Sequence, residues 1–388
     1  MTTNRTPGWY PLLLAAASIG VANSVVFTLL SDLQDAYHFT DTGLGLIAGT
    51  GFLVGLVGQL VFAPFADRGH SKMLLILGLS LAVVGSICFA FSTTLLTLIA
   101  SRAVVGLSNS LFQPSSRAVT IAIGDHDMAH RLGTLSAVEL AGFVTGPVIG
   151  GALVDPFGLK VPFLVAGSFA LAGAVMLSTR QLPQPPVDPH RRMAFDLLRL
   201  PRIRAGILAT VALFVPVGFY DATLDRYLTD MGASNRLIGF AFLTFGVPFA
   251  LFASRGGRLS DRYGPLKIGV LVSCAVAPLT AYYGFITVPI VFVMLGLVEG
   301  ILQSMGIPAA SAIIALGAPE GRVAAAQGLA GAGSMVLGAA TAYVAGPMYE
   351  HLGPHWMYGS AGAGVLLLSL LAAHQGRRRS PAAPTANL

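Results

Sequence analysis

Residues 106–114 read GLSNSLFQP, and residues 300–308, which lie 194 positions later, read GILQSMGIP. The two stretches share a glycine, a serine and a proline at matching positions, and an amide residue at a fourth, Asn109 in one and Gln303 in the other. Self-similarity at a fixed spacing is a signature of repeated architecture. This repeat predicts that the chain contains two copies of one structural unit.

Further coincidences occur at almost the same spacing. Asp67-Arg68 recurs 194 residues later as Asp261-Arg262, and Asp32 is followed after 193 residues by Asp225. Between the two copies lies a stretch rich in proline and arginine, from Arg180 to Arg204, which has the composition of a linker. Several matches at one spacing are poorly explained by chance, so the linker is expected to join two equivalent halves.

The composition places both halves in a membrane. Of the 388 residues, 54% are hydrophobic and only 10% are charged, and the mean hydropathy is +0.75. Soluble domains carry charge on about 25% of their residues, so a soluble enzyme, a nucleic-acid binder and a secreted disulfide scaffold are all excluded. The two cysteines, Cys88 and Cys274, lie in apolar runs and are expected to act as small hydrophobic residues.

A helix needs roughly 20 apolar residues to cross the hydrocarbon core, and twelve such stretches can be found. They lie near 11–31, 43–63, 73–92, 95–117, 132–153, 159–179, 205–226, 235–254, 267–286, 288–315, 323–346 and 355–373. The first has no basic region before it and no small-residue cleavage site, so it is interpreted as a retained span. The predicted fold is an all-α polytopic membrane protein made of two pseudo-symmetric six-helix bundles. The expected divisions are bundle 1–179, cytoplasmic linker 180–204, bundle 205–373 and cytoplasmic tail 374–388.

The distribution of lysine and arginine predicts the orientation. With the N-terminus inside, 19 of the 23 basic residues fall in cytoplasmic segments, and only Lys160, Arg226 and Arg236 fall outside. Basic residues favour the cytoplasmic side of membrane proteins, so both termini are expected there. The net charge of +6 then reflects topology and a possible attraction to anionic lipid, and nucleic acid is not needed as a partner. Arginine outnumbers lysine twenty to three, which indicates a GC-rich bacterial genome and the bacterial plasma (inner) membrane.

Four motifs are similar to those of a known family. The segment 257–267, GRLSDRYGPLK, resembles the G-x-x-x-D-R-x-G-x-x-K loop of the major facilitator superfamily, and Asp67-Arg68 lies in a degraded copy of it. Arg102-x-x-x-Gly106 resembles the family's fourth-helix signature. The fifth span resembles its antiporter signature, which is common among drug/proton exporters, and carries Gly142, Gly146, Pro147, Gly150 and Gly151. The resemblance covers nearly the whole chain and implies the major facilitator fold.

The resemblance also implies alternating access, in which two halves rock around a substrate at the membrane midplane. The loop residues expected to act in gating are Asp67, Arg68, Gly257, Asp261, Arg262 and Gly264. A carboxylate at a cytoplasmic helix end can accept bonds from a neighbouring helix N-terminus. Such bonds are expected to hold the outward-open state and to break when the protein opens inward. Glycines at four-residue spacing allow close helix approach, and Pro147 is expected to kink its helix.

Ionisable residues inside spans are costly and therefore indicate function. Arg102, Asn109 and Gln113 share one helical stripe, and Glu299 and Gln303 share another. We expect the two stripes to face each other, with Glu299 protonated for part of the cycle or paired with Arg102. The residues expected to couple protons are Glu299, Asp32, Arg102, Glu139 and Asp225, and those expected to line the substrate cavity are Asn109, Gln113, Asp221 and Gln303.

The function that these features favour is proton-coupled export of small lipophilic or amphipathic compounds. Uptake of a small metabolite by symport or uniport, a lipid flippase of the same fold and an intramembrane lipid-modifying enzyme are the alternatives. No G-x-x-x-x-G-K-[ST] loop is present, so ATP is not expected as the energy source. The chain is expected to be no enzyme, to need no metal or cofactor, and to work as a monomer with its substrate, protons and the bilayer as partners.

Overall fold

The computed structural model describes residues 8–65, 70–123, 128–183, 194–319 and 322–377. The regular structure of these residues is entirely helical. The first group of helices is α1 Trp9–Ser24, η1 Val25–Thr28, α2 Leu30–Tyr37, α3 Asp41–Phe65, α4 Ser71–Phe91, α5 Leu95–Ala122, α6 Met128–Phe157 and α7 Lys160–Ser178. The second is η3 Ala194–Arg199, α8 Pro201–Asp230, α9 Asn235–Tyr263, α10 Pro265–Tyr283, α11 Pro289–Gly317, α12 Val323–Leu352 and α13 Pro354–Arg377.

Within the described ranges, 12 helices are long and apolar enough to cross a membrane, and each overlaps one predicted span. The all-helical fold class is therefore confirmed. The differences lie at the ends, where polar residues extend the helix beyond its apolar part. The largest is in α9, which continues to Tyr263, nine residues past the predicted end at 254.

The first span differs from its predicted form. Its α-helix ends at Ser24, a 3-10 turn follows over Val25–Thr28, and the short helix α2 then carries Asp32. The matching span α8 runs without a break to Asp230 and carries Asp225 inside it. Asp32 and Asp225 are thus equivalent in sequence but occupy different local structures.

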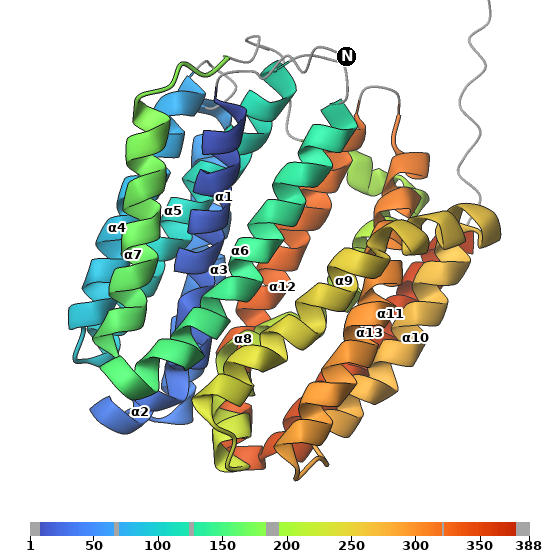
Figure 1. The fold of residues 1–388 in the computed structure, drawn as a ribbon. Helices are drawn as coiled ribbons and strands as arrows, with labels where there is room; N and C mark the ends of the chain where they lie inside the picture. The colour runs from blue at the N-terminus through green and yellow to red at the C-terminus, as the bar shows by residue number, and fades with distance from the viewer. Residues whose placement is uncertain (1–7, 66–69, 124–127, 184–193, 320–321, 378–388) are drawn as a thin grey trace, which may run out of the picture.

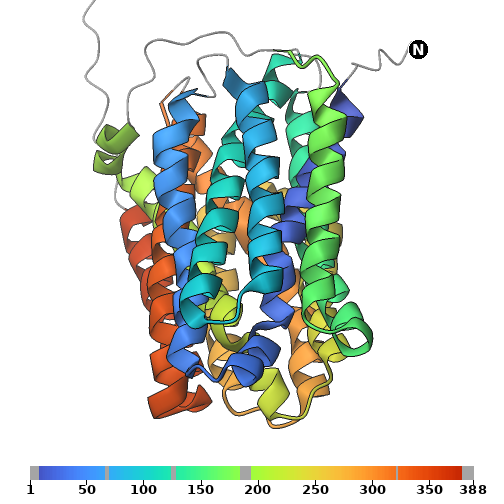
Figure 2. The same cartoon turned by 90° about the vertical axis from the view of Figure 1, so that its left-hand side faces the viewer.

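The helices form two bundles, α1 to α7 and α8 to α13 (Figure 1). The view turned by 90° shows the spans running nearly parallel (Figure 2). The bundles meet mainly where α3 packs against α12 and α6 against α9. Each bundle has a hydrophobic core of its own: Leu79 and Phe112 pack together in the first, and Tyr283 and Phe292 in the second.

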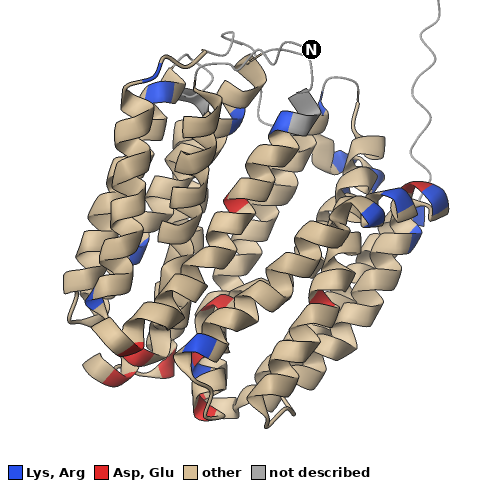
Figure 3. Cartoon of the chain, in the orientation of Figure 1, with Lys and Arg blue, Asp and Glu red and all other residues tan. Residues whose placement is uncertain are grey.

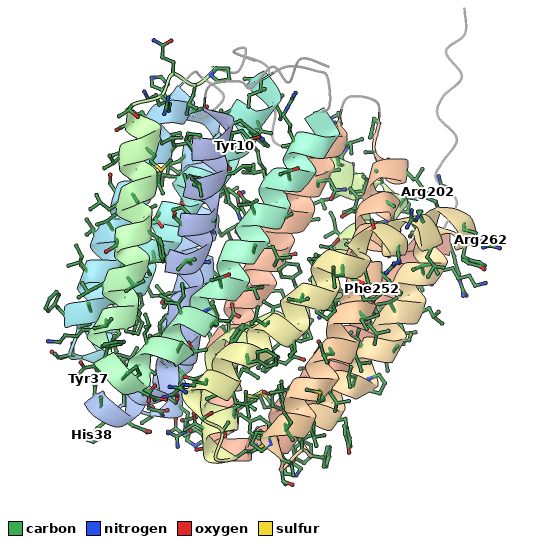
Figure 4. The ribbon with its side chains drawn as sticks, in the orientation of Figure 1. Tyr10, Tyr37, His38, Arg202, Phe252 and Arg262 are labelled. Atoms are coloured by element: carbon green, nitrogen blue, oxygen red, sulfur yellow. The ribbon has the colours of Figure 1, made fainter. Side chains whose placement is uncertain are left out.

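The two ends of the molecule differ in charge. Most lysine and arginine residues lie at the end where α1 begins, which we call the basic end, and most carboxylates lie elsewhere (Figure 3). Arg202 and Arg262 lie at the basic end, and Tyr37 and His38 lie at the opposite end (Figure 4). The asymmetry agrees with the pattern used to predict the orientation.

The opposite end is closed by bonds between the bundles, and we call it the sealed end. Arg226 of α8 bonds Asp35 of α2 at 2.7 Å, and Thr42 of α3 donates through its backbone N–H to Glu350 of α12 at 3.1 Å. Toward the basic end, α6 and α9 diverge (Figure 1). Further bonds join the two bundles between the sealed end and the middle of the spans.

Candidate transport site

Glu299 is buried in the middle of α11, with 2% of its surface exposed. The hydroxyl of Tyr220, on α8, lies 3.1 and 3.0 Å from its two carboxyl oxygens. Gln303, one helical turn later, donates its amide to the same carboxyl at 3.1 Å. The sequence-based pairing of Glu299 with Gln303 on one stripe is therefore present, and Tyr220 is an additional partner.

Tyr220 belongs to an aromatic cluster that sequence reasoning did not identify. Its ring lies edge-on to Tyr283, with centroids 6.0 Å apart, and tilted to Tyr358 at 6.1 Å. Tyr227 and Phe292 complete the cluster. These aromatic residues come from four helices and follow no single stripe, so the only available signal was a high density of tyrosine in the second half.

In this conformation Arg102 bonds Asn23 rather than Glu299, and the expected pairing of Arg102 with Glu299 stays a prediction. Arg102 is buried on α5 and donates to the backbone carbonyl of Asn23 at 2.6 Å and to its side-chain oxygen at 3.2 Å. Its guanidinium lies 4.8 Å from the centre of the Phe27 ring. The carboxylate whose charge acts on Arg102 is Asp221, from the other bundle. The charge that acts on Arg102 across the bundles is therefore that of Asp221, and no ion pair between the two is found among the described residues.

The remaining cavity candidates lie at several depths. Asp221 is 6% exposed on α8, and Gln303 is buried on α11. Asn109 and Gln113 are half-buried on α5. The structure thus brings Arg102 and Asp221 into electrostatic contact and places Glu299 and Gln303 together, but it does not join these groups into one hydrogen-bonded cluster.

Glu139 lies on α6 toward the basic end. Its carboxylate is 3.9 Å from Arg117 and 3.4 Å from the hydroxyl of Ser116, both on α5. It therefore has a cationic partner within its own bundle, which distinguishes it from Glu299.

Asp32 and Asp225 approach each other at the sealed end. Asp225 is 1% exposed on α8 and accepts a bond from the backbone N–H of Ser31, next to Asp32, at 2.6 Å. Asp32 lies outside the membrane-spanning segments; burial raises the pKa of its carboxyl, a bond from Asn235 lowers it, and the charges of Asp155 and Asp35 raise it further.

The glycines of the fifth span allow α6 to approach two helices. Gly142 and Gly146 face α1 and Gly150 faces η1, and an added Cβ on each would overlap backbone or side-chain atoms. Gly151 faces the start of α9, where a Cβ would overlap the carbonyl of Asn235. Pro147 leaves α6 continuous, and its carbonyl accepts a bond from Thr28 at 3.0 Å. The motif thus packs α6 against its own bundle on one side and the other bundle on the opposite side.

The expected gating loops are only partly described. Asp67 and Arg68 lie outside the described residues. In the second half, Gly257, Asp261 and Arg262 lie on the last turns of α9 rather than in a loop, and only Gly264, with φ of 92°, forms the turn into α10. Asp261 is exposed, and no bond from it to a neighbouring helix is found in the described part of the chain.

Comparison with known proteins places these features in a family. The model of the Major Facilitator Superfamily matches residues 12–224 and again residues 206–387. The human MFS-type transporter SLC18B1 is 26% identical over 336 residues, which is 81% of this chain and 73% of that protein. Multidrug resistance protein MdtG of Enterobacter lignolyticus (strain SCF1) is 26% identical over 277 residues, 68% of this chain and 66% of that protein. The vesicular acetylcholine transporter of Rattus norvegicus is 28% identical over 326 residues, 76% of this chain and 60% of that protein.

Solved structures share the fold at lower identity. A bacterial homologue of the human lysosomal transporter Spinster, in an inward-facing and unoccupied conformation, has a TM-score of 0.74 and 18% identity, and covers 96% of this chain and 98% of its own. A D-xylose-proton symporter has a TM-score of 0.76 and 13% identity, and covers 94% of this chain and 96% of its own.

Proposed function

We propose, from the premise that this chain belongs to the major facilitator superfamily, that it is a proton-coupled exporter of small lipophilic or amphipathic compounds. Members of this family are transporters rather than enzymes, so transport itself follows from the family match. Coupling to protons, the direction and the class of substrate are the proposed parts.

The observation that carries proton coupling is the surroundings of Glu299. An ionised carboxylate buried without a countercharge costs several kcal/mol, and the partners of Glu299 are the neutral side chains of Tyr283, Tyr220 and Gln303. One phenolic hydrogen serves only one acceptor well, yet the Tyr220 oxygen is close to both carboxyl oxygens. A protonated Glu299 explains both short distances, because one carboxyl oxygen donates a hydrogen bond to the Tyr220 phenol while the other accepts one from it.

Proton release would then require a change of surroundings. We infer that rocking of the bundles brings Glu299 toward water or toward a cation, where its proton can leave. Arg102 has a neutral partner in Asn23, and its charge already interacts with Asp221 of the opposite bundle. We propose that Arg102, Glu139, Asp32 and Asp225 take part in the same coupling, and that Asn109, Gln113, Asp221 and Gln303 line the substrate path.

Two observations support export. The relatives include a protein named for multidrug resistance, and the glycine-rich face of α6 matches the antiporter-type pattern while packing against both α1 and α9. The ring of Phe27 lies 5.8 Å from that of Phe143 and 6.3 Å from that of Phe242. A substrate path along these three rings would favour lipophilic compounds.

The orientation and assembly are also part of the proposal. We infer that the basic end is cytoplasmic, so that both termini and the 180–204 linker lie inside and the present conformation is open inward. Residues 1–179 and 205–373 are proposed to move as two bodies of a monomer in a bacterial inner membrane. Cysteine labelling near Arg192 from outside intact cells would contradict this orientation.

The test is transport by the purified protein in proteoliposomes with an imposed pH gradient. Lipophilic and amphipathic compounds are screened on both sides of the membrane. Substrate movement opposite to the movement of protons supports antiport. Substrate movement in the same direction as protons would support symport and contradict export. Lipid translocation without solute movement would indicate a flippase.

A further inference from the structure

Asp225 binds the start of a helix that belongs to the other bundle. Its Oδ2 atom accepts the backbone N–H of Ser31 at 2.6 Å and also interacts with the N–H of Leu30 and the hydroxyl of Ser31. These are first-turn groups of α2, and the N-cap residue Leu29 offers no side-chain acceptor. Free N–H groups at a helix start attract a carboxylate, so one bundle supplies the cap for a helix of the other.

The other oxygen of Asp225 is left without a partner. Asp225 Oδ1 and Asp32 Oδ2 are both buried and have no hydrogen bond in the described structure. Asp32 follows Ser31, whose N–H bonds Asp225, so the two carboxyl groups lie near each other and the charge of Asp32 acts on Asp225. A buried acceptor without a donor costs about 1–3 kcal/mol, and two adjacent carboxylates repel each other. One proton bound at this pair would give both oxygens a partner.

We propose that Asp32 and Asp225 form a proton-binding site across the two bundles, and that one proton shared between them holds the sealed end closed. The proton comes from water outside the sealed end and converts two carboxylates with a combined charge of −2 into a pair with a charge of −1. When it returns to that water, the two charges repel and the bundles separate at this end.

Among the described neighbours, no cation is hydrogen-bonded to either carboxylate of the pair. Asp35 on α2 and Asp230 on α8 are both bonded to Arg226, which uses its guanidinium on these two exposed groups. Asn235 of α9 gives its amide to Asp155 of α6 at 2.8 Å and to Asp32. Asp41 on α3 accepts from Gln34 at 2.7 Å, and Glu350 on α12 accepts from Thr42. Most of these neighbours are anionic, which favours a bound proton at Asp32 and Asp225.

The test measures the width of the sealed end against pH. Spin labels are placed on His38→Cys and His351→Cys, two exposed positions in different bundles, after Cys88 and Cys274 are replaced by serine. We expect the short-distance population to grow as the pH falls. Since one proton is bound, the ratio of sealed to open molecules should change by up to about tenfold per pH unit.

Substitution by asparagine imitates the shared proton, because an amide can accept from Ser31 and donate across the pair. Asp225→Asn and, separately, Asp32→Asn should stay sealed at every pH and lose the pH dependence. The matched control, Asp41→Asn, changes a carboxylate whose hydrogen bond, from Gln34, stays within the first bundle, and should keep the wild-type response. A pH response that persists in Asp225→Asn, or an end that opens in both variants, would overturn the shared proton.

This inference rests on the proposed proton-coupled cycle, but the distance measurement needs no substrate. If the labels respond to pH as expected and driven flux is absent, the proposed export fails and the proton site stands. If driven flux is present and the sealed end does not respond to pH, the proton site fails and the export stands.

Discussion

The two bundles use the repeated motif of α5 and α11 in the same way for packing. An added Cβ on Gly106 would lie 2.7 Å from the carbonyl of Gly51 on α3, and one on Gly300 would lie 2.5 Å from the carbonyl of Phe245 on α9. Helices α3 and α9 are the second spans of their bundles. Ser110 and Ser304 each donate back to a carbonyl three residues earlier, at 2.7 and 2.6 Å.

The same two helices differ in their charges. Arg102 corresponds in the repeat to Gly296, and Glu299 corresponds to Val105. The first bundle therefore holds a buried cation and the second a buried carboxyl, at positions that have no charged counterpart. On these two helices, the repeat preserves the contacts between helices, whereas the buried charged groups differ between the two halves.

The largest expected effect is on Glu299. Glu299→Gln keeps the bonds to Tyr220 and Gln303 but cannot release a proton, so pH-gradient-driven flux should be abolished while substrate binding and exchange persist. Glu299→Asp should keep partial coupling, since the carboxyl remains on a shorter side chain. Flux and binding are measured side by side in proteoliposomes.

The control for this comparison lies in the first bundle. Glu139→Gln removes a carboxylate that already has Arg117 as a partner and should reduce driven flux less than Glu299→Gln. Normal driven flux in Glu299→Gln would remove this residue from the mechanism and make Glu139 or Asp32 the better candidate.

A smaller effect is expected at the end of α9. Asp261 is exposed in this conformation, so its expected bond to a neighbouring helix would form only in the opposite state. A bond to a charged group contributes about 1.5–3 kcal/mol, so Asp261→Asn should slow transport about tenfold or more. Thermal stability should be unchanged because the side chain is exposed here. Wild-type turnover in the folded variant would exclude the gating role.

The sequence was sufficient for the span count and for the close packing of the fifth span's glycines. Apolar length determines how many helices cross a membrane, and close packing demands small residues at fixed positions, so both leave a pattern in the sequence. The pairing of Glu299 with Gln303 was also predictable, because four residues separate neighbours on one helix face.

The partners from distant segments were not predictable. Asn23 binds Arg102 because the helix α1 ends just after it and the chain turns there, and no periodicity marks such a break. Tyr220 reaches Glu299 across 79 positions of sequence. The cap that Asp225 gives to α2 depends on how the two bundles meet, and that arrangement is a property of one conformation rather than of a local pattern.

The shared packing role predicts equal losses of stability. Gly106→Ala and Gly300→Ala each force a methyl group against a backbone carbonyl, which should destabilise the protein by about 1–3 kcal/mol. Gly257→Ala is the control, since nothing lies within 4 Å of its added Cβ and alanine favours the helix. Thermal unfolding in detergent measures all three. A loss confined to one of the two repeat glycines would break the equivalence of the bundles.

The smallest effects on stability are expected from the contacts between the linker and each bundle. The two bundles make these contacts with different groups. In the first, Lys72 donates to the backbone carbonyls of Ser178 and Arg180 at 2.9 and 2.7 Å. In the second, Arg322 donates to both carboxylate oxygens of Asp196, one of them at 2.8 Å, and so lowers the pKa of that carboxyl. Only the second contact contains a group that titrates in acid.

Because the pKa of Asp196 is lowered in the folded protein, its ionised carboxylate contributes to stability at pH values above its unfolded pKa of about 3.9. That contribution is lost as the pH falls through the folded pKa. The contact should therefore be unchanged between pH 7 and 5 and weaken only in stronger acid. Because the pair is exposed, Asp196→Asn should leave the unfolding temperature within about 2 °C of the wild type. Trypsin cleavage after Arg199 should nevertheless become a few-fold faster in Asp196→Asn at neutral pH, since the η3 turn loses its tie to α12. Lys72→Met, which releases only the first bundle, should leave that cleavage rate unchanged; equal acceleration in both variants would show that the two contacts act as one.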